Sequence, residues 1–316
     1  MMKRKYMSEF AINTYSSYLT ICYPNDLNNL SLETKINYHI YMITLIPKLT
    51  IVKDSLQVFE DHLSLKIRVK TENRDFVVTS RFTLDPDINH KEQEYEIDKA
   101  AKTFTVTTKE GFVFKQRVLP MYLDYLANGT GVEKLDTEII YIGQSYGKNG
   151  ERTALERLKS HSTLQRIQSE LLFEGGERDL AILLLEFTPR LLSSFDGRSK
   201  SYEKSSEDDL KHLHAVMESP PLRLNKQVVN ITEAALINYF KPYYNDIFKD
   251  NFPDVQHKGY RQYYDLDYNA VSIELDPDAI DLRLYSKEKN YQPFSSIKYD
   301  LHPENIRKSM FDIFLD

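Results

Sequence analysis

Apolar and polar positions alternate along several segments of the first third of the chain. Over residues 63–69 every second side chain is apolar, which is the period of a half-buried β-strand. A second strand is predicted over residues 75–84, and a hairpin is predicted around Gly111, because glycine readily adopts the positive φ of a tight turn. Residues 38–49 are largely apolar and fit either a helix or a strand. We therefore expect residues 1–117 to form a β-rich N-terminal domain.

Strand and helix patterns follow one another in the middle of the chain. The predicted strands are residues 118–126, 138–143 and 180–187. Helical periodicity covers residues 151–173, 207–217 and 232–240. From this succession of strands and helices, residues 118–250 are expected to form an α+β domain. Residues 251–316 hold shorter alternating stretches and are expected to form a C-terminal extension.

The composition is that of an ordinary globular protein of 316 residues, with 41% hydrophobic and 28% charged residues. No apolar stretch approaches the roughly 20 residues that span a bilayer, so no membrane partner is expected. The basic N-terminus is not followed by an apolar leader segment. The single cysteine, Cys22, cannot form an intramolecular disulfide or a zinc site by itself. These features predict a cytoplasmic protein.

The formal net charge is −6. A protein that coats nucleic acid needs a positive balance, because neutralisation of phosphates drives that binding. A role on nucleic acid must therefore be local. Residues 141–172 carry more basic than acidic groups, which predicts that a substrate would be captured at a small cationic site.

Five side chains of the middle region are of types that carry catalysis. They are Tyr141, Arg157, His161, Glu233 and Asn245. Each also has an ordinary structural explanation. A strand tyrosine packs against its neighbours, a helix arginine is solvated, and Glu233 can close a capping box that begins at Asn230. Arg157 and His161 are four residues apart and are expected to share one helix face.

Taken together, these residue types can cleave a phosphodiester bond. A carboxylate can hold one divalent cation whose shell is completed by water or phosphate oxygens. A guanidinium can neutralise the charge that develops on the phosphoryl group in the transition state. A tyrosine hydroxyl beside them can accept a proton from the attacking water, and an asparagine can orient its neighbours.

In this order the fragments resemble the GIY-YIG nuclease superfamily over residues 118–245. Tyr141-Ile142-Gly143 matches the YIG element, Arg157 and His161 match the spacing on the following helix, and the stretch from Glu233 to Asn245 matches the closing Glu-x2-Leu-Ile…Pro-x2-Asn pattern. The resemblance implies a three-stranded antiparallel sheet flanked by helices. It also implies that Glu233 ligates Mg²⁺ or Mn²⁺, that Arg157 holds the scissile phosphate and that Tyr141 is a candidate general base. His161 and Asn245 would support them.

The resemblance also implies a first tyrosine in a Gly-Ile-Tyr element. No literal Gly-Ile-Tyr precedes Tyr141 in this sequence. The best match upstream is Pro120-Met121-Tyr122 on the predicted strand, with Tyr125 as a competitor. We therefore assign Tyr122 as the expected first tyrosine.

The function expected from these residues and the resemblance is a metal-dependent endonuclease that hydrolyses phosphodiester bonds, and the resemblance alone implies DNA rather than RNA as the substrate. The alternative is a catalytically degenerate scaffold that binds nucleic acid or protein. The N-terminal domain is expected to contact DNA, a second copy of the chain or a regulatory protein, and the sequence does not choose among them.

Overall fold

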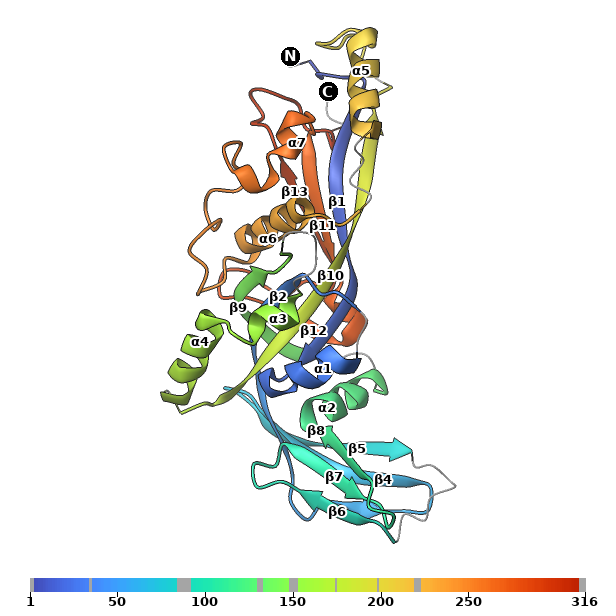
Figure 1. Ribbon diagram of the computed structural model, residues 1–316, viewed down its shortest axis with the longest axis vertical. Helices are drawn as coiled ribbons and strands as arrows, with labels where there is room; N and C mark the ends of the chain where they lie inside the picture. Colours follow the sequence, from blue (N-terminus) through green and yellow to red (C-terminus); the bar gives the residue numbers. More distant parts are fainter. Residues whose placement is uncertain are drawn as a thin grey trace.

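The computed structural model describes residues 3–33, 36–83, 92–129, 133–147, 153–173, 175–197, 199–218 and 223–312. Over these residues the protein is α+β, with more strand than helix, and its main sheet is mixed and curled. The molecule is elongated (Figure 1). Helix α5 (Ser206–Glu218) lies with both chain ends at one tip, and the β-rich part of the first third lies at the other.

The main sheet has ten strands, and its central path runs in the order β12-β9-β2-β10-β1-β11-β13. These strands are β1 (Ser8–Cys22), β2 (Ile40–Ile51), β9 (Leu135–Gln144), β10 (Arg178–Phe195), β11 (Ala270–Leu275), β12 (Leu282–Tyr285) and β13 (Ser295–Asp300). The pairs β1–β11 and β9–β12 are parallel, and the other neighbours on the path are antiparallel. The sheet is therefore larger than the three strands expected, although β9, β2 and β10 lie side by side and antiparallel within it.

Strands from all three segments expected as domains share this sheet. β2 pairs with β9 and β10 over its first half and with β4 (His62–Lys70) over its second half. β1 and β11 join the first and last segments directly. The β1–β11 and β2–β9 pairs thus cross the boundaries expected at residues 117 and 250.

The β-rich region predicted from alternation is present. β4 and β5 (Asp75–Thr83) are antiparallel neighbours, and the short strand β3 (Gln57–Val58) pairs with β4 on its other edge. A second, three-stranded sheet consists of β6 (Glu94–Ile97), β7 (Thr103–Thr107) and β8 (Val113–Arg117). β7 and β8 form the predicted hairpin, and Gly111 in their turn has a φ of 85°.

The strand predicted over residues 118–126 is wrong, because this segment is helix α2 (Val118–Ala127). Val118, Tyr122 and Leu126 are buried and recur every four residues, so they lie on one helix face. That face packs into the main core, and the helix contacts β5. A short apolar run is compatible with a buried strand or a buried helix, and here the helix is formed.

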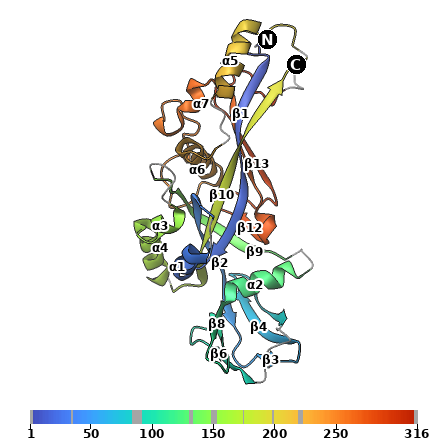
Figure 2. The same cartoon turned by 45° about the vertical axis from the view of Figure 1, so that its right-hand side comes forward.

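The remaining helices lie mainly along one side of the long β1 and β10 strands (Figure 2). They are α1 (Leu27–Glu33), α3 (Ala154–Leu158), α4 (Ser162–Phe173), α6 (Lys226–Phe240) and α7 (Gln262–Asp265). The helix expected over residues 151–173 is divided into α3 and α4, and residues 151 and 152 lie outside the described part. In the described residues no helix combines the length and apolar character required to cross a bilayer.

Helix α6 begins six residues earlier than predicted. Its N-cap is Asn225, whose side chain accepts hydrogen bonds from the backbone N–H groups of Gln227 and Val228. The capping box expected at Asn230 and Glu233 is therefore wrong. Both residues lie inside the helix, because Asn225 already satisfies the first free N–H groups.

Candidate active site

Two tyrosines project from the antiparallel pair β2–β9. Tyr41 on β2 lies opposite Gly143, and Ile43 lies opposite Tyr141, so the two tyrosines are diagonal neighbours on one face of the sheet. Their ring centroids are 6.2 Å apart. A Cβ atom on Gly143 would lie 2.5 Å from the Tyr41 hydroxyl oxygen, so only glycine leaves room for the Tyr41 side chain at this position.

Arg157 reaches the tyrosine pair from helix α3. The helix begins with a capping box between Thr153 and Glu156, and the backbone N–H of Ala154 donates to the Tyr38 carbonyl at 2.7 Å. These contacts fix the helix against the start of β2. The Nε of Arg157 donates to the Tyr41 hydroxyl oxygen at 3.2 Å.

His161 reaches the same oxygen from the turn between α3 and α4. Because α3 ends at Leu158, the expectation that Arg157 and His161 share one continuous helix face is wrong. The two side chains nevertheless meet, since the Nε2 atom of His161 lies 2.9 Å from the Tyr41 hydroxyl oxygen. The His161 ring also lies 5.4 Å from the Tyr141 ring.

The hydrogen bonds around His161 define its tautomer. Its Nδ1 accepts the backbone N–H of Leu164 at 3.1 Å, so in the neutral ring the proton lies on Nε2 and is donated to Tyr41. Burial and the nearby Arg157 guanidinium lower the pKa of His161 to about 4. The ring is therefore neutral at physiological pH.

Tyr41 thus accepts hydrogen bonds from Arg157 and His161, and its ring lies 6.2 Å from that of Tyr141. Burial raises the pKa of both tyrosines above the usual value. For Tyr141, the negative charge of Glu233 adds to this rise, whereas Arg157 and Tyr41 lower the pKa.

Glu233 faces this group from helix α6. Burial raises the pKa of its carboxyl group to about 8, against the opposing effects of Arg157 and of a hydrogen bond from the Gln144 backbone N–H. In the part of the chain that the structure describes, no three His, Cys, Asp or Glu side chains gather into a metal-binding group. A cation at this place would therefore have Glu233 as its carboxylate ligand and would need water or substrate oxygens for the rest of its shell.

Asn245 holds the strand that carries Tyr141. Its Oδ1 accepts the backbone N–H of Ile142 and its Nδ2 donates to the Ile142 carbonyl, both at 2.8 Å. Antiparallel pairing directs the backbone groups of alternate residues away from the neighbouring strand, and Asn245 occupies this free edge of β9. It therefore acts on the Tyr141 strand through the backbone, and Tyr141 itself is not its hydrogen-bond partner.

Tyr122 is not part of this group. It lies on α2, stacked on Tyr125 with ring centroids 5.9 Å apart, and burial, followed by the charge of Glu133, raises the pKa of its hydroxyl. The assignment of Tyr122 as the first tyrosine assumed that residues 118–126 form a strand, whereas this segment forms helix α2. The tyrosine that lies beside Tyr141 is Tyr41, which the sequence analysis did not single out.

A signal for Tyr41 exists in the sequence. The tripeptide His39-Ile40-Tyr41 keeps an Ile-Tyr pair, with histidine in place of glycine. It was overlooked because residues 38–49 fitted either a helix or a strand, and because α2 and the β-rich region separate β2 from β9 along the chain.

Five side chains therefore meet at the site, from β2, β9, the α3–α4 segment and α6: Tyr41, Tyr141, Arg157, His161 and Glu233. Asn245 binds the free edge of β9 beside them. Comparison of the chain with protein-family models, curated proteins and solved structures gives no match.

Proposed function

We propose that the protein is a metal-dependent endonuclease of the GIY-YIG kind that hydrolyses phosphodiester bonds in DNA. The observation that carries the proposal is the convergence of two tyrosine hydroxyls, one guanidinium and one carboxylate on one side of the β2–β9 pair. The antiparallel neighbours β9, β2 and β10 also support the resemblance. In this proposal Tyr41 replaces Tyr122 as the first tyrosine.

Glu233 fits the role of ligand for Mg²⁺ or Mn²⁺. Burial makes its ionisation costly, as its raised pKa indicates, and a cation would offset that cost. When bound, a divalent cation supplies positive charge to the scissile phosphate and to the leaving oxygen.

The remaining residues divide the work of hydrolysis. Arg157 lies where its guanidinium can hold a phosphate oxygen and stabilise the charge of the transition state. We assign Tyr141 as the group that orients the attacking water and, in its deprotonated form, takes a proton from it, and Arg157 lowers the pKa of its hydroxyl. Neutral His161 and Arg157 hold the Tyr41 hydroxyl in place beside it.

The experiment that tests the proposal is cleavage of plasmid, branched and single-stranded DNA, with RNA in parallel, in the presence of Mg²⁺ or Mn²⁺. Glu233→Gln and Arg157→Ala should each lower the cleavage rate by on the order of 1,000-fold while the circular dichroism spectrum remains that of a folded protein. Undiminished cleavage by both variants would remove the assignment.

A second candidate is a catalytically degenerate scaffold that binds nucleic acid or protein. The net charge of −6 and the histidine in place of the first glycine favour it. A Mn²⁺ titration monitored by thermal unfolding separates the two candidates. The nuclease should be stabilised by Mn²⁺ and its Glu233→Gln variant should not, whereas the scaffold should show no effect that depends on Glu233.

A further inference from the structure

Three side chains on helix α6 follow one ridge of the helix. Gln227, Asn230 and Glu233 recur at intervals of three residues. The loop over residues 252–262 packs beside the first two, and the Oε1 of Gln227 accepts the backbone N–H of Gln262 at 2.9 Å. The third is the candidate metal ligand, so the ridge joins the C-terminal segment to the site.

The side-chain amide of Asn230 accepts one hydrogen bond and donates another. Its Oδ1 accepts the Nε2 of Gln144 at 3.1 Å, and its Nδ2 donates to the carbonyl oxygen of Gly259 at 2.8 Å. Only a side chain with an acceptor and a donor on adjacent atoms satisfies both partners. An aspartate would place an oxygen against the Gly259 carbonyl.

Gln144 is the residue between Asn230 and Glu233. It is the last residue of β9, its side-chain amide is held by Asn230, and its backbone N–H lies near enough to Glu233 to lower the pKa of that carboxyl. The position of Gln144 therefore affects the surroundings of the Glu233 carboxylate. A change at Asn230 is transmitted to Glu233 through this one residue.

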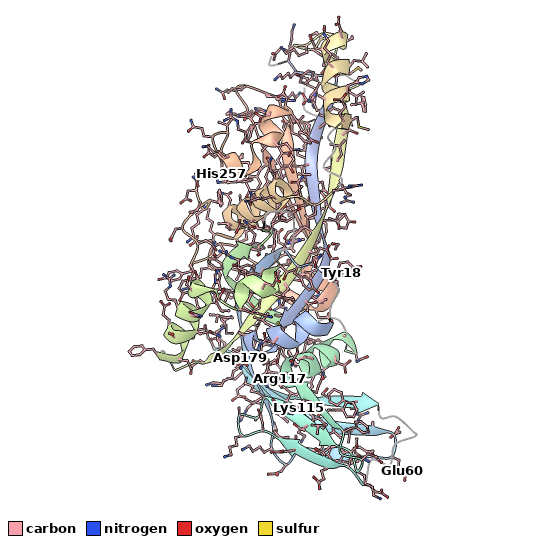
Figure 3. The ribbon with its side chains drawn as sticks, viewed as in Figure 1. Tyr18, Glu60, Lys115, Arg117, Asp179 and His257 are labelled. Atoms are coloured by element: carbon pink, nitrogen blue, oxygen red, sulfur yellow. The ribbon has the colours of Figure 1, made fainter. Side chains whose placement is uncertain are left out.

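The Gly259 carbonyl is held in place by its own loop. The backbone N–H of Gly259 donates to Nδ1 of His257 at 3.2 Å, and the His257 ring stacks on buried Tyr260 with centroids 4.7 Å apart. Figure 3 labels His257, which lies in this loop beside α6. A Cβ atom on Gly259 would lie 3.0 Å from Nδ2 of Asn230 and 2.8 Å from Cε1 of His257. The loop thus presents its carbonyl oxygen to Asn230 in a close contact that glycine permits.

We propose that Asn230 is a positioning residue for Glu233, and that the Gly259 carbonyl of the C-terminal segment sets its orientation. The inference rests on the proposed nuclease function. It assigns to residues 251–316 a part in building the metal site that the sequence did not indicate. Groups that orient a metal ligand change metal affinity or activity by about 10- to 100-fold when they are removed.

The test compares Asn230→Asp with Asn238→Asp. Asn238 lies on the same helix and ties it to another loop, through hydrogen bonds from Nδ2 to the carbonyls of Phe248 and Lys249, so the same change costs similar contacts away from Gln144. We expect Asn230→Asp to raise the Mn²⁺ concentration that gives half-maximal thermal stabilisation by about tenfold, and to lower kcat more than it raises KM. Asn238→Asp should leave both within about twofold.

Gln144→Met provides a second variant if Asn230→Asp does not fold. It removes the side-chain amide and keeps the backbone N–H that lowers the pKa of Glu233, and it should shift the Mn²⁺ midpoint in the same direction. A wild-type protein that cleaves DNA and responds to Mn²⁺, together with an Asn230→Asp variant that matches Asn238→Asp, overturns the positioning role alone. A wild-type protein that does neither overturns the nuclease proposal and this inference with it.

Discussion

The Tyr41 hydroxyl is the atom on which the candidate site depends at the scale of single residues. It is buried, it accepts hydrogen bonds from Arg157 and His161, and it lowers the pKa of the neighbouring Tyr141. Its loss would leave two N–H donors without their acceptor and would remove this effect on Tyr141.

We therefore expect Tyr41→Phe to lower the single-turnover cleavage rate by about 100-fold. The matched control is Tyr122→Phe, which removes the hydroxyl of another buried tyrosine on α2 and should leave the rate unchanged. Rates for the two variants that fall together would show that Tyr41 contributes only through packing.

The residues that the sequence singled out and that the structure brings together share one property. Tyr141, Arg157, Glu233 and Asn245 belong to fragments whose order and short spacings are visible in the chain. Tyr41 was not recognised because its contact with Tyr141 is made across a long insertion, and spacing carries no information about such a pair. The assignment of Tyr122 assumed that the first strand must immediately precede the second.

At the scale of elements, alternation was a sound guide where one face of a strand is solvated, as in β4 and β5. It failed for α2, because a short apolar run is compatible with either a buried strand or a buried helix. The start of α6 was misplaced for another reason. Asn225 and Asn230 are both good N-cap residues, and only the tertiary contacts of Asn230 with Gln144 and Gly259 distinguish them.

The open edge of β9 gives a prediction at this scale. Asn245→Ala would remove both hydrogen bonds to Ile142 and leave a buried backbone N–H and C=O without their partner. We expect a loss of about 2–3 kcal/mol in the free energy of unfolding, measured by urea denaturation. Asn238→Ala, which removes two hydrogen bonds from a less buried side chain, should cost about 1 kcal/mol. An Asn245→Ala loss no greater than that of the control would contradict the role given to Asn245.

At the scale of the whole molecule, β2 joins the β-rich end to the body that holds the candidate site, and two partly buried ion pairs among the described residues reinforce this junction. Lys102, after β6, pairs with Asp179 on β10, and Arg117, at the end of β8, pairs with Asp26. Figure 3 shows Asp179 and Arg117 near each other where the two parts meet. Asp179 also accepts the backbone N–H of Leu49 at 3.0 Å, so it binds β2 and the β6–β7 turn at once.

We expect Asp179→Asn to destabilise the protein by about 2 kcal/mol near neutral pH, because it leaves the partly buried Lys102 ammonium without its counter-charge. Burial lowers the pKa of Lys102, and Asp179 opposes that effect. In the variant, the pKa of Lys102 in the folded protein falls further below its value in the unfolded chain. The loss of stability is therefore full at a pH below the folded-state pKa of Lys102. It is relieved as the pH rises through that pKa toward the unfolded value of about 10.4.

Denaturant unfolding of wild type and variant across this pH range measures the deficit. The matched control is Glu177→Gln, which breaks the exposed Lys70–Glu177 pair and should cost less than about 0.5 kcal/mol at every pH. A deficit in Asp179→Asn that grows as the pH rises, or that equals the control, would mean that this ion pair does not hold the two parts together. A deficit that shrinks with rising pH is expected because deprotonation of Lys102 removes the unpaired buried charge.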